Sequence, residues 1–80
     1  MPESLGLTVQ QLRYFLAIES AGSISEAARQ LDVSKGTLAR VLSQAEEKLG
    51  FPLFEGSRKG ARATSDGGRF LEFARKVVFA

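Results

Sequence analysis

The sequence contains no cysteine and no histidine, and these two absences remove much of the usual catalytic and metal-binding chemistry. Without cysteine there is no disulfide and no thiolate ligand, and without either residue the common nucleophile and general-base pairs are missing. The carboxylates are scattered, and neither a glycine-rich phosphate loop nor a metal-ligand spacing occurs. The sequence therefore disfavours an enzyme and indicates neither a cofactor nor a metal.

Long apolar runs are also missing from the chain. None approaches the roughly 18 residues that are needed to cross a bilayer. The N-terminus lacks the basic segment followed by an apolar segment that is typical of a secretory signal. No internal repeat or low-complexity segment occurs, and 80 residues suit one small domain. We therefore expect a single domain over residues 1–80, located in the cytoplasm.

The basic residues are unevenly distributed, although the net charge is only +2. Residues 1–57 hold five Lys or Arg against seven Asp or Glu, which gives −2, and residues 58–80 hold six against two, which gives +4. A clustered positive face is typical of proteins that bind nucleic acid, because neutralising phosphates releases counterions. A solvated helix face would show the same composition, so the charge alone decides nothing.

The first helix is predicted over residues 9–20. Thr8 and Gln11 have the spacing of a capping box, in which each side chain accepts a hydrogen bond from the other residue's backbone N–H. Apolar residues then recur at helical spacing. Gly22 ends the helix, because glycine adopts the left-handed conformation of a helix C-terminus without a steric penalty.

A helix-turn-helix follows. Ser23 and Glu26 repeat the capping-box spacing at the start of a short helix over residues 24–31. Two adjacent alanines in that helix allow the close approach that a sharp turn between helices requires. Asp32 suits the left-handed conformation of such a turn, and Ser34 is expected to cap the next helix.

The third helix is predicted to end at Gly50 and to be followed by a small wing. The apolar segment 51–54 is expected to be a strand, since its proline cannot continue a helix. A basic turn bounded by glycines, over residues 56–60, leads to a return strand over residues 61–64. The aromatic residues at apolar periodic positions are expected in the core rather than on a base-stacking surface: Phe15, Phe51, Phe54 and Phe70.

A fourth helix is predicted from a cap at Thr64 or Ser65, and it is apolar on two sides. One side would pack on the core, and the other would most simply pack on a second copy of the chain in a symmetric dimer. Fraying of the last residues is the alternative explanation. The residues predicted to form the dimer contact are Phe70, Leu71, Ala74, Val77 and Val78.

The candidate DNA-binding residues lie at the start of the third helix, at the start of the second, and in the wing. In a helix-turn-helix the second helix of the motif lies in the major groove, and its first outward residues contact base edges. Lysine and arginine can donate to guanine, while capping hydroxyls and a basic wing can contact phosphates or the minor groove. The candidates are Ser23, Ser25, Ser34, Lys35, Gly36, Thr37, Ala39, Arg40, Arg58, Lys59 and Arg62. Surface charge and helix capping are the alternative roles for these residues.

From about Leu7 to Val78, the chain resembles the N-terminal DNA-binding domain of LysR-type transcriptional regulators. The resemblance rests on several separated motifs in the same order: Gln11–Phe15, Gly22–Ser25, Ala27–Ala28, Leu31, Val33–Ser34, Leu38, Arg40, Glu46–Gly50, Leu53–Glu55, Thr64 and Gly67. Lys35 and Gly36 depart from the Gln-Pro that is common in the family, and Ala39 replaces a common serine. These differences affect the expected base preference rather than the docking mode.

The resemblance implies a mainly α winged helix-turn-helix, with a three-helix core, a two-stranded wing and a long C-terminal linker helix from about residue 65. It also implies a homodimer through that helix. In full-length members a separate domain, absent from these 80 residues, senses a small-molecule effector. We therefore expect sequence-specific binding of double-stranded DNA by a bacterial transcriptional regulator. A winged-helix module for protein–protein interaction is the alternative, and RNA binding is disfavoured because aromatics placed for stacking are missing.

Overall fold

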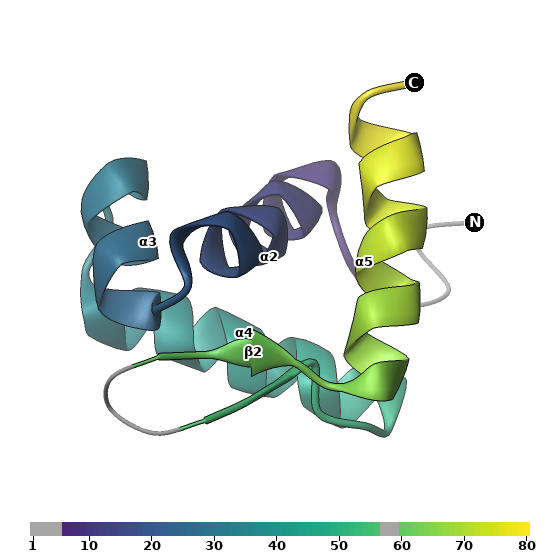
Figure 1. Ribbon diagram of the computed structural model, residues 1–80. Helices are drawn as coiled ribbons and strands as arrows, with labels where there is room; N and C mark the ends of the chain where they lie inside the picture. The colour runs from purple at the N-terminus through teal and green to yellow at the C-terminus, as the bar shows by residue number, and fades with distance from the viewer. Residues whose placement is uncertain (1–5, 57–59) are drawn as a thin grey trace.

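Four helices and a two-stranded wing make up the described part of the chain, residues 6–56 and 60–80, in the computed structural model (Figure 1). The elements are α2 (Val9–Ala21), α3 (Ile24–Leu31), α4 (Lys35–Leu49), β1 (Phe54–Glu55), β2 (Arg62–Ala63) and α5 (Ser65–Val78). This mainly α architecture confirms the predicted winged helix-turn-helix. No helix in the described ranges is long and apolar enough to cross a membrane.

Helix α2 begins and ends where its capping residues predict. The Gln11 N–H donates to the Thr8 hydroxyl at 3.1 Å, and the Thr8 N–H donates to the Gln11 side chain at 3.0 Å, so the capping box is complete. Gly22 ends the helix with a φ of 79°. These local signals are sufficient because each of them acts within one helical turn.

The start of α3 has only half of the predicted capping box. The Ser23 hydroxyl accepts the Glu26 N–H at 3.1 Å. The Glu26 carboxylate, however, accepts hydrogen bonds from the Arg29 guanidinium instead of the Ser23 N–H. These bonds lower the pKa of Glu26 below its ordinary value, since they favour the charged carboxylate. The turn after α3 is as predicted, because Asp32 is left-handed with a φ of 59°.

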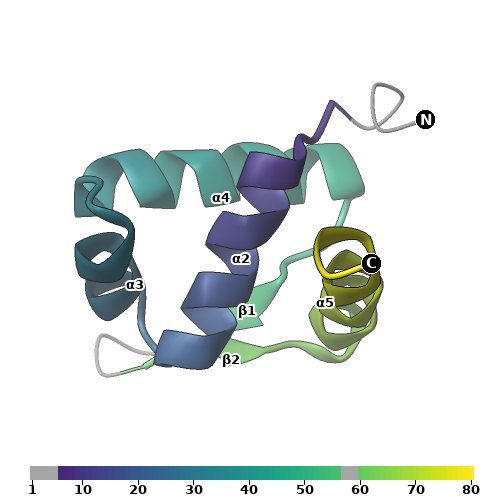
Figure 2. The same ribbon diagram turned by 90° about the horizontal axis from the view of Figure 1, so that it is seen from above.

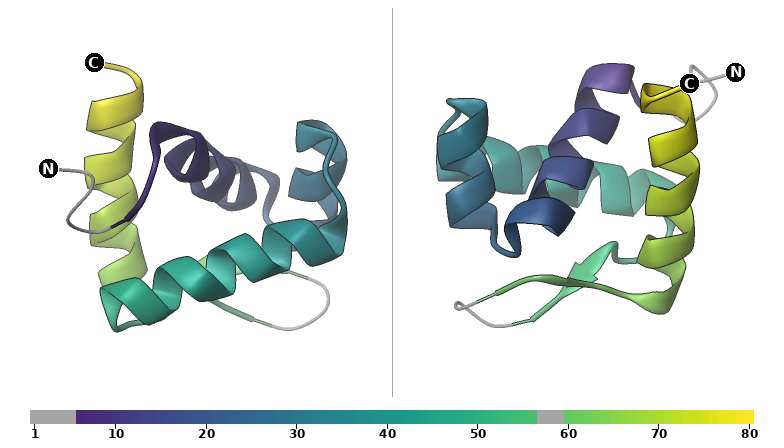
Figure 3. Two further views of the ribbon diagram at one scale, coloured as in Figure 1. Left: turned by 180° about the vertical axis from the view of Figure 1, so that it is seen from behind. Right: turned by 45° about the horizontal axis from the view of Figure 1, so that its top comes forward.

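The core lies where α2 crosses α4, between α3 and α5 (Figure 2). Helix α3 stands over one end of α4 and α5 stands at the other end (Figure 3). Ala27 and Ala28 are 0% and 3% exposed, which confirms that small residues bring α3 close to its neighbours. The fully buried large side chains are Phe15, Ile18, Leu38, Leu53 and Leu71. Phe54 is also buried, and Phe51 and Phe70 pack partly buried against this core, as predicted.

The wing strands are shorter than the sequence predicts. They pair antiparallel with Phe54 opposite Ala63, and the segment before Phe54 is not a strand. The reason is that the Leu53 N–H is bonded outside the ladder: it donates to the Glu46 carboxylate at 2.6 Å, and only the bond from the Thr64 N–H to the Leu53 C=O, at 3.0 Å, continues the pairing. Likewise, the Ala61 N–H donates to the Gly22 C=O at 2.8 Å, which ties the wing to the turn between α2 and α3.

The buried face of helix α5 differs from the one that the spacing of its apolar residues predicts. Thr64 is its N-cap, since its hydroxyl accepts the Gly67 N–H at 2.9 Å. Gly67, Leu71 and Ala74 are buried along one stripe that faces the rest of the chain. The prediction that Leu71 and Ala74 contact a second copy is therefore wrong, because both are 0% exposed within this chain. Glycine was not counted as an apolar position, and this hid the stripe.

Candidate nucleic-acid interface

The starts of α3 and α4 meet the wing around one surface hollow of about 260 Å³. The α3 end contributes Ser23 and Ser25, and the α4 end contributes Lys35. The wing contributes backbone at Gly56 and Gly60. The structure therefore brings three of the predicted DNA-binding residues, which come from two helices, to the edge of the same concave surface.

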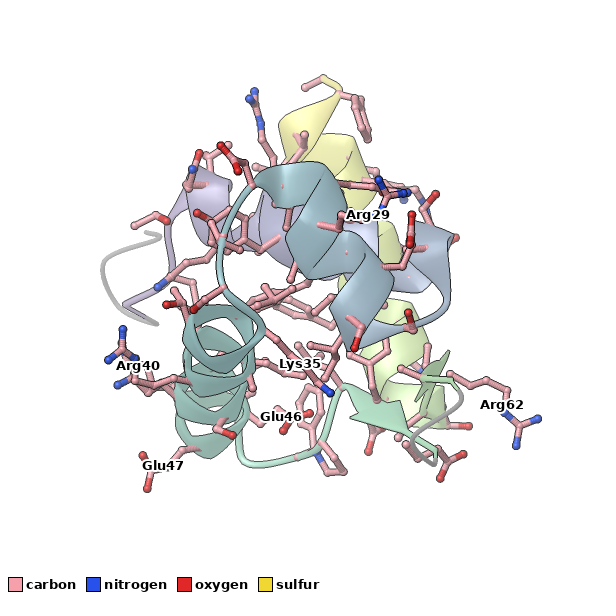
Figure 4. The ribbon with its side chains drawn as sticks, turned by 90° about the vertical axis from the view of Figure 1, so that its left-hand side faces the viewer. Arg29, Lys35, Arg40, Glu46, Glu47 and Arg62 are labelled. Carbon is pink, nitrogen blue, oxygen red and sulfur yellow. The ribbon has the colours of Figure 1, made fainter. Side chains whose placement is uncertain are left out.

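The first turns of α4 present small and basic residues to solvent. Lys35, Gly36 and Arg40 are exposed, and Ala39 is half-buried. Figure 4 shows Lys35 directed toward the wing and Arg40 on the opposite side of the helix. The helix therefore has a narrow outer edge at Gly36 and Ala39, with one cation on either side of it.

The hydroxyl groups at the start of α4 are already hydrogen-bonded to each other. Ser34 caps the helix by accepting the Thr37 N–H at 3.0 Å, and its hydroxyl donates to the Thr37 hydroxyl at 2.8 Å. Ser34 is exposed and Thr37 is half-buried. Their first role is therefore structural, and any contact with a phosphate would be an additional use of the same groups.

The wing adds a third described cation to this side of the molecule. Arg62 is exposed on β2 and projects outward in Figure 4. The candidates Arg58 and Lys59 lie outside the described residues. Arg29, also visible in Figure 4, is engaged by Glu26 and so contributes less free positive charge. Exposed cations thus extend from α4 to the wing: Lys35, Arg40 and Arg62.

Gly36→Ala is expected to stabilise the free domain by up to about 1 kcal/mol, because glycine is a poor helix former. Gly36 lies in the first turn of α4, its φ is not left-handed, and an added Cβ would have nothing within 4 Å. Thermal unfolding followed by circular dichroism would measure the change. A lower unfolding temperature would contradict this description of the site.

Glu46 is the residue near this surface that the sequence analysis missed. Its carboxylate accepts the Leu53 N–H at 2.6 Å, which ties α4 to the start of the wing. A signal was present, because Glu46 lies four residues after Leu42 and three before Leu49, on the same inner stripe of the helix. A carboxylate at an inner position indicates that a hydrogen-bond donor lies opposite.

Comparison with known proteins places this arrangement in a family. The model of the family described as "Bacterial regulatory helix-turn-helix protein, lysR family" matches residues 9–68. The chain belongs to the LysR family. The match runs from the first residue of α2 into the start of α5, so it includes the whole helix-turn-helix and the wing.

Two curated relatives illustrate how this LysR-family domain compares in sequence. It is 41% identical over 69 residues to the HTH-type transcriptional regulator ClcR of Pseudomonas putida, covering 86% of this chain and 24% of ClcR. It is 43% identical over 72 residues to the small neutral protease regulatory protein of Streptomyces coelicolor, covering 90% and 22% respectively. The chain thus spans about a quarter of the length of these relatives.

Solved structures of LysR-family DNA-binding domains share this fold. The crystal structure of a CbnR DBD–DNA complex matches with a TM-score of 0.86 and 37% identity, over 91% of this chain and 84% of that one. A BenM DBD complex with catB site 1 DNA matches with a TM-score of 0.84 and 34% identity, over 91% and 78%. Both of those structures contain DNA, and the domain described here is a LysR-type helix-turn-helix DNA-binding domain.

Proposed function

We propose that this LysR-family domain binds double-stranded DNA in a sequence-specific manner, with α4 in the major groove and the wing on the minor groove or backbone. The observation that carries the proposal is that the starts of α3 and α4 meet the wing at one surface hollow, with Lys35 directed toward the wing. Similarity to solved DNA complexes supports the same docking mode. Lys35, Arg40 and Arg62 supply positive charge across this surface.

Each group on this surface has a role that its chemistry suits. Arg40 can donate two hydrogen bonds to guanine, and Ala39 can contact a thymine methyl group. Gly36 lets the helix backbone approach the floor of the groove. Ser23 and Ser25, at the start of α3, and Ser34 and Thr37, at the start of α4, lie where free N–H groups favour a phosphate. Lys59 and Arg58 in the wing are proposed to contact the backbone or the minor groove, with Arg62 beside them.

We further propose a homodimer through the outer face of α5. Phe73 is 52% exposed and Val77 is 40% exposed, and half-buried Phe70 lies one turn before Phe73. Near the end of the helix, half-buried Val78 and exposed Phe79 border an apolar hollow of about 490 Å³ against α2. Covering these side chains would remove apolar surface from water. Two recognition helices would then reach half-sites about 34 to 36 Å apart, or a multiple of that distance.

The relatives of this domain are transcriptional regulators about four times its length. We therefore propose that it acts within a bacterial regulator in the cytoplasm, which binds a small-molecule effector through a domain outside these 80 residues. Its role is non-catalytic.

Selection of bound duplexes from a random pool, followed by sequencing, tests the proposed function. The expected result is an enriched motif whose binding weakens log-linearly with salt, because phosphate contacts release counterions. Enrichment of no motif would contradict sequence-specific binding. Binding of a protein partner by a domain with no affinity for duplex DNA would favour an interaction module instead.

Arg40→Ala is expected to reduce discrimination between the selected site and a mismatched site by roughly tenfold to a hundredfold, as for loss of one bidentate base contact. Arg40 is exposed on α4 and can be removed without disturbing the core. Fluorescence anisotropy on the two duplexes would measure the change. Lys76→Ala, which removes the same charge from exposed α5, is the matched control. Equal losses of affinity on both duplexes would show that Arg40 contacts a phosphate rather than a base.

A further inference from the structure

Glu46 connects the recognition helix to the first residues of the wing. From α4, its Oε2 atom accepts the Leu53 N–H at 2.6 Å and lies 3.4 Å from the Phe54 nitrogen, which also donates to it. Leu53 is fully buried, and Phe54 opens β1. Hydrogen bonds to a carboxylate are charge-assisted, and a buried N–H without a partner is costly. The carboxylate therefore holds the start of the wing against α4.

The same segment is held from its other side by the start of α5. The Thr64 N–H donates to the Leu53 C=O at 3.0 Å, and the Thr64 hydroxyl donates to the Pro52 C=O at 2.6 Å. That hydroxyl also accepts the Gly67 N–H at 2.9 Å. A continuous series of hydrogen bonds therefore runs from α4, through residues 52–54, to α5.

The charge of Glu46 is directed at these backbone groups. The ion pairs found within residues 6–56 and 60–80 are Arg29–Glu26 and Arg75–Glu19, so Glu46 belongs to neither. It is half-buried and points toward the wing, whereas its neighbour Glu47 is exposed and points away (Figure 4). Two adjacent carboxylates on one helix thus have different surroundings, and only Glu46 contacts the wing segment.

We infer that Glu46 is a positioning residue, which holds the wing, and through Thr64 the start of α5, at one angle to the recognition helix. The inference rests on the proposed DNA binding, because its consequence is that α4 and the wing contact one duplex at the same time. When the clamp is weakened, the wing shifts relative to α4, and contacts between the wing and phosphates are lost while α4 still reaches the bases.

Glu46→Gln tests this inference, with Glu47→Gln as the matched control. The first substitution keeps the side-chain size and an acceptor oxygen but removes the charge that strengthens the bond to Leu53. The second removes the same charge from the exposed neighbour. On the duplex selected by the unchanged protein, Glu46→Gln should bind about tenfold more weakly than Glu47→Gln, with a salt slope shallower by about 1, as for one lost phosphate contact. The Leu53 amide should also exchange faster with solvent.

The possible outcomes separate positioning from a purely structural role. Equal affinities and salt slopes for the two variants would overturn the inference even if the Leu53 amide exchanged faster, because Glu46 would then serve folding alone. If the Glu46→Gln protein does not fold, Glu46→Asp is tested in its place, because aspartate keeps the charge but its shorter side chain withdraws the carboxylate from Leu53. Failure of both variants to fold also overturns the inference. If the unchanged protein selects no duplex, the proposed function fails and this inference fails with it, which is a result distinct from equal behaviour of the variants.

Discussion

Gly67→Ala is expected to destabilise the domain by about 2 kcal/mol, and so to lower its unfolding temperature by roughly 10 °C. Gly67 lies on the inner stripe of α5, against the segment that precedes β1. A Cβ there would lie 2.7 Å from the Leu53 carbonyl carbon and 2.8 Å from its Cα atom, and closer still to the carbonyl oxygen. All three are backbone atoms, so the helix or the start of the wing has to move.

The adjacent glycine provides a matched control for this substitution. An added Cβ at Gly68 would have nothing within 4 Å. Gly68→Ala should therefore stabilise α5 by up to about 1 kcal/mol through helix propensity alone. Chemical unfolding of both variants would measure the difference. Equal behaviour of the two would contradict the close packing of α5 on Leu53.

Leu71→Glu is expected to unfold the domain, and Phe73→Glu to leave it folded. Leu71 is 0% exposed in the core, and a buried, unpaired carboxylate costs several kcal/mol, which is comparable with the whole stability of a small domain. Phe73, two residues later, is 52% exposed on the outer face of the same helix. The same new side chain therefore meets opposite environments at the two positions.

Circular dichroism and sedimentation distinguish the two outcomes. Phe73→Glu should retain the helical spectrum and weaken self-association, because it places charge on the proposed dimer face. Unchanged mass in sedimentation would contradict a dimer through this face. A folded Leu71→Glu protein that only dissociates would show instead that Leu71 faces a second copy, against its burial within one chain.

The sequence predicted the elements of this domain well because their signals are local. Thr8, Gly22, Asp32 and Ser34 each act on backbone groups within about one helical turn, and the structure confirms all four. The family motifs also lie in these segments, and the family match confirms the resemblance. The partner of Glu26 was predicted less well, because Arg29 competes with the Ser23 N–H for the same carboxylate.

The candidate interface was predicted in part. Ser23, Ser25 and Lys35 were each predicted as DNA-binding candidates from their position at the start of a helix, and only the structure shows that they border one hollow. The inner position of Glu46 indicates a hydrogen-bond donor opposite, but the sequence does not identify that donor, because it is the backbone N–H of later residues. The contacts of these residues with DNA stay a prediction.

By itself, the sequence determined the four helices, the sharp turn at Asp32, the existence of a wing and the family to which the domain belongs. Only the tertiary structure decided which side of α5 is covered by the rest of the chain. It also decided why position 67 requires glycine, and which backbone N–H groups bind the Glu46 carboxylate. The physical reason is the distance along the chain over which each interaction acts. Caps and periodicity act between neighbours in the chain, whereas burial and close packing depend on where a distant segment such as Leu53 comes to lie.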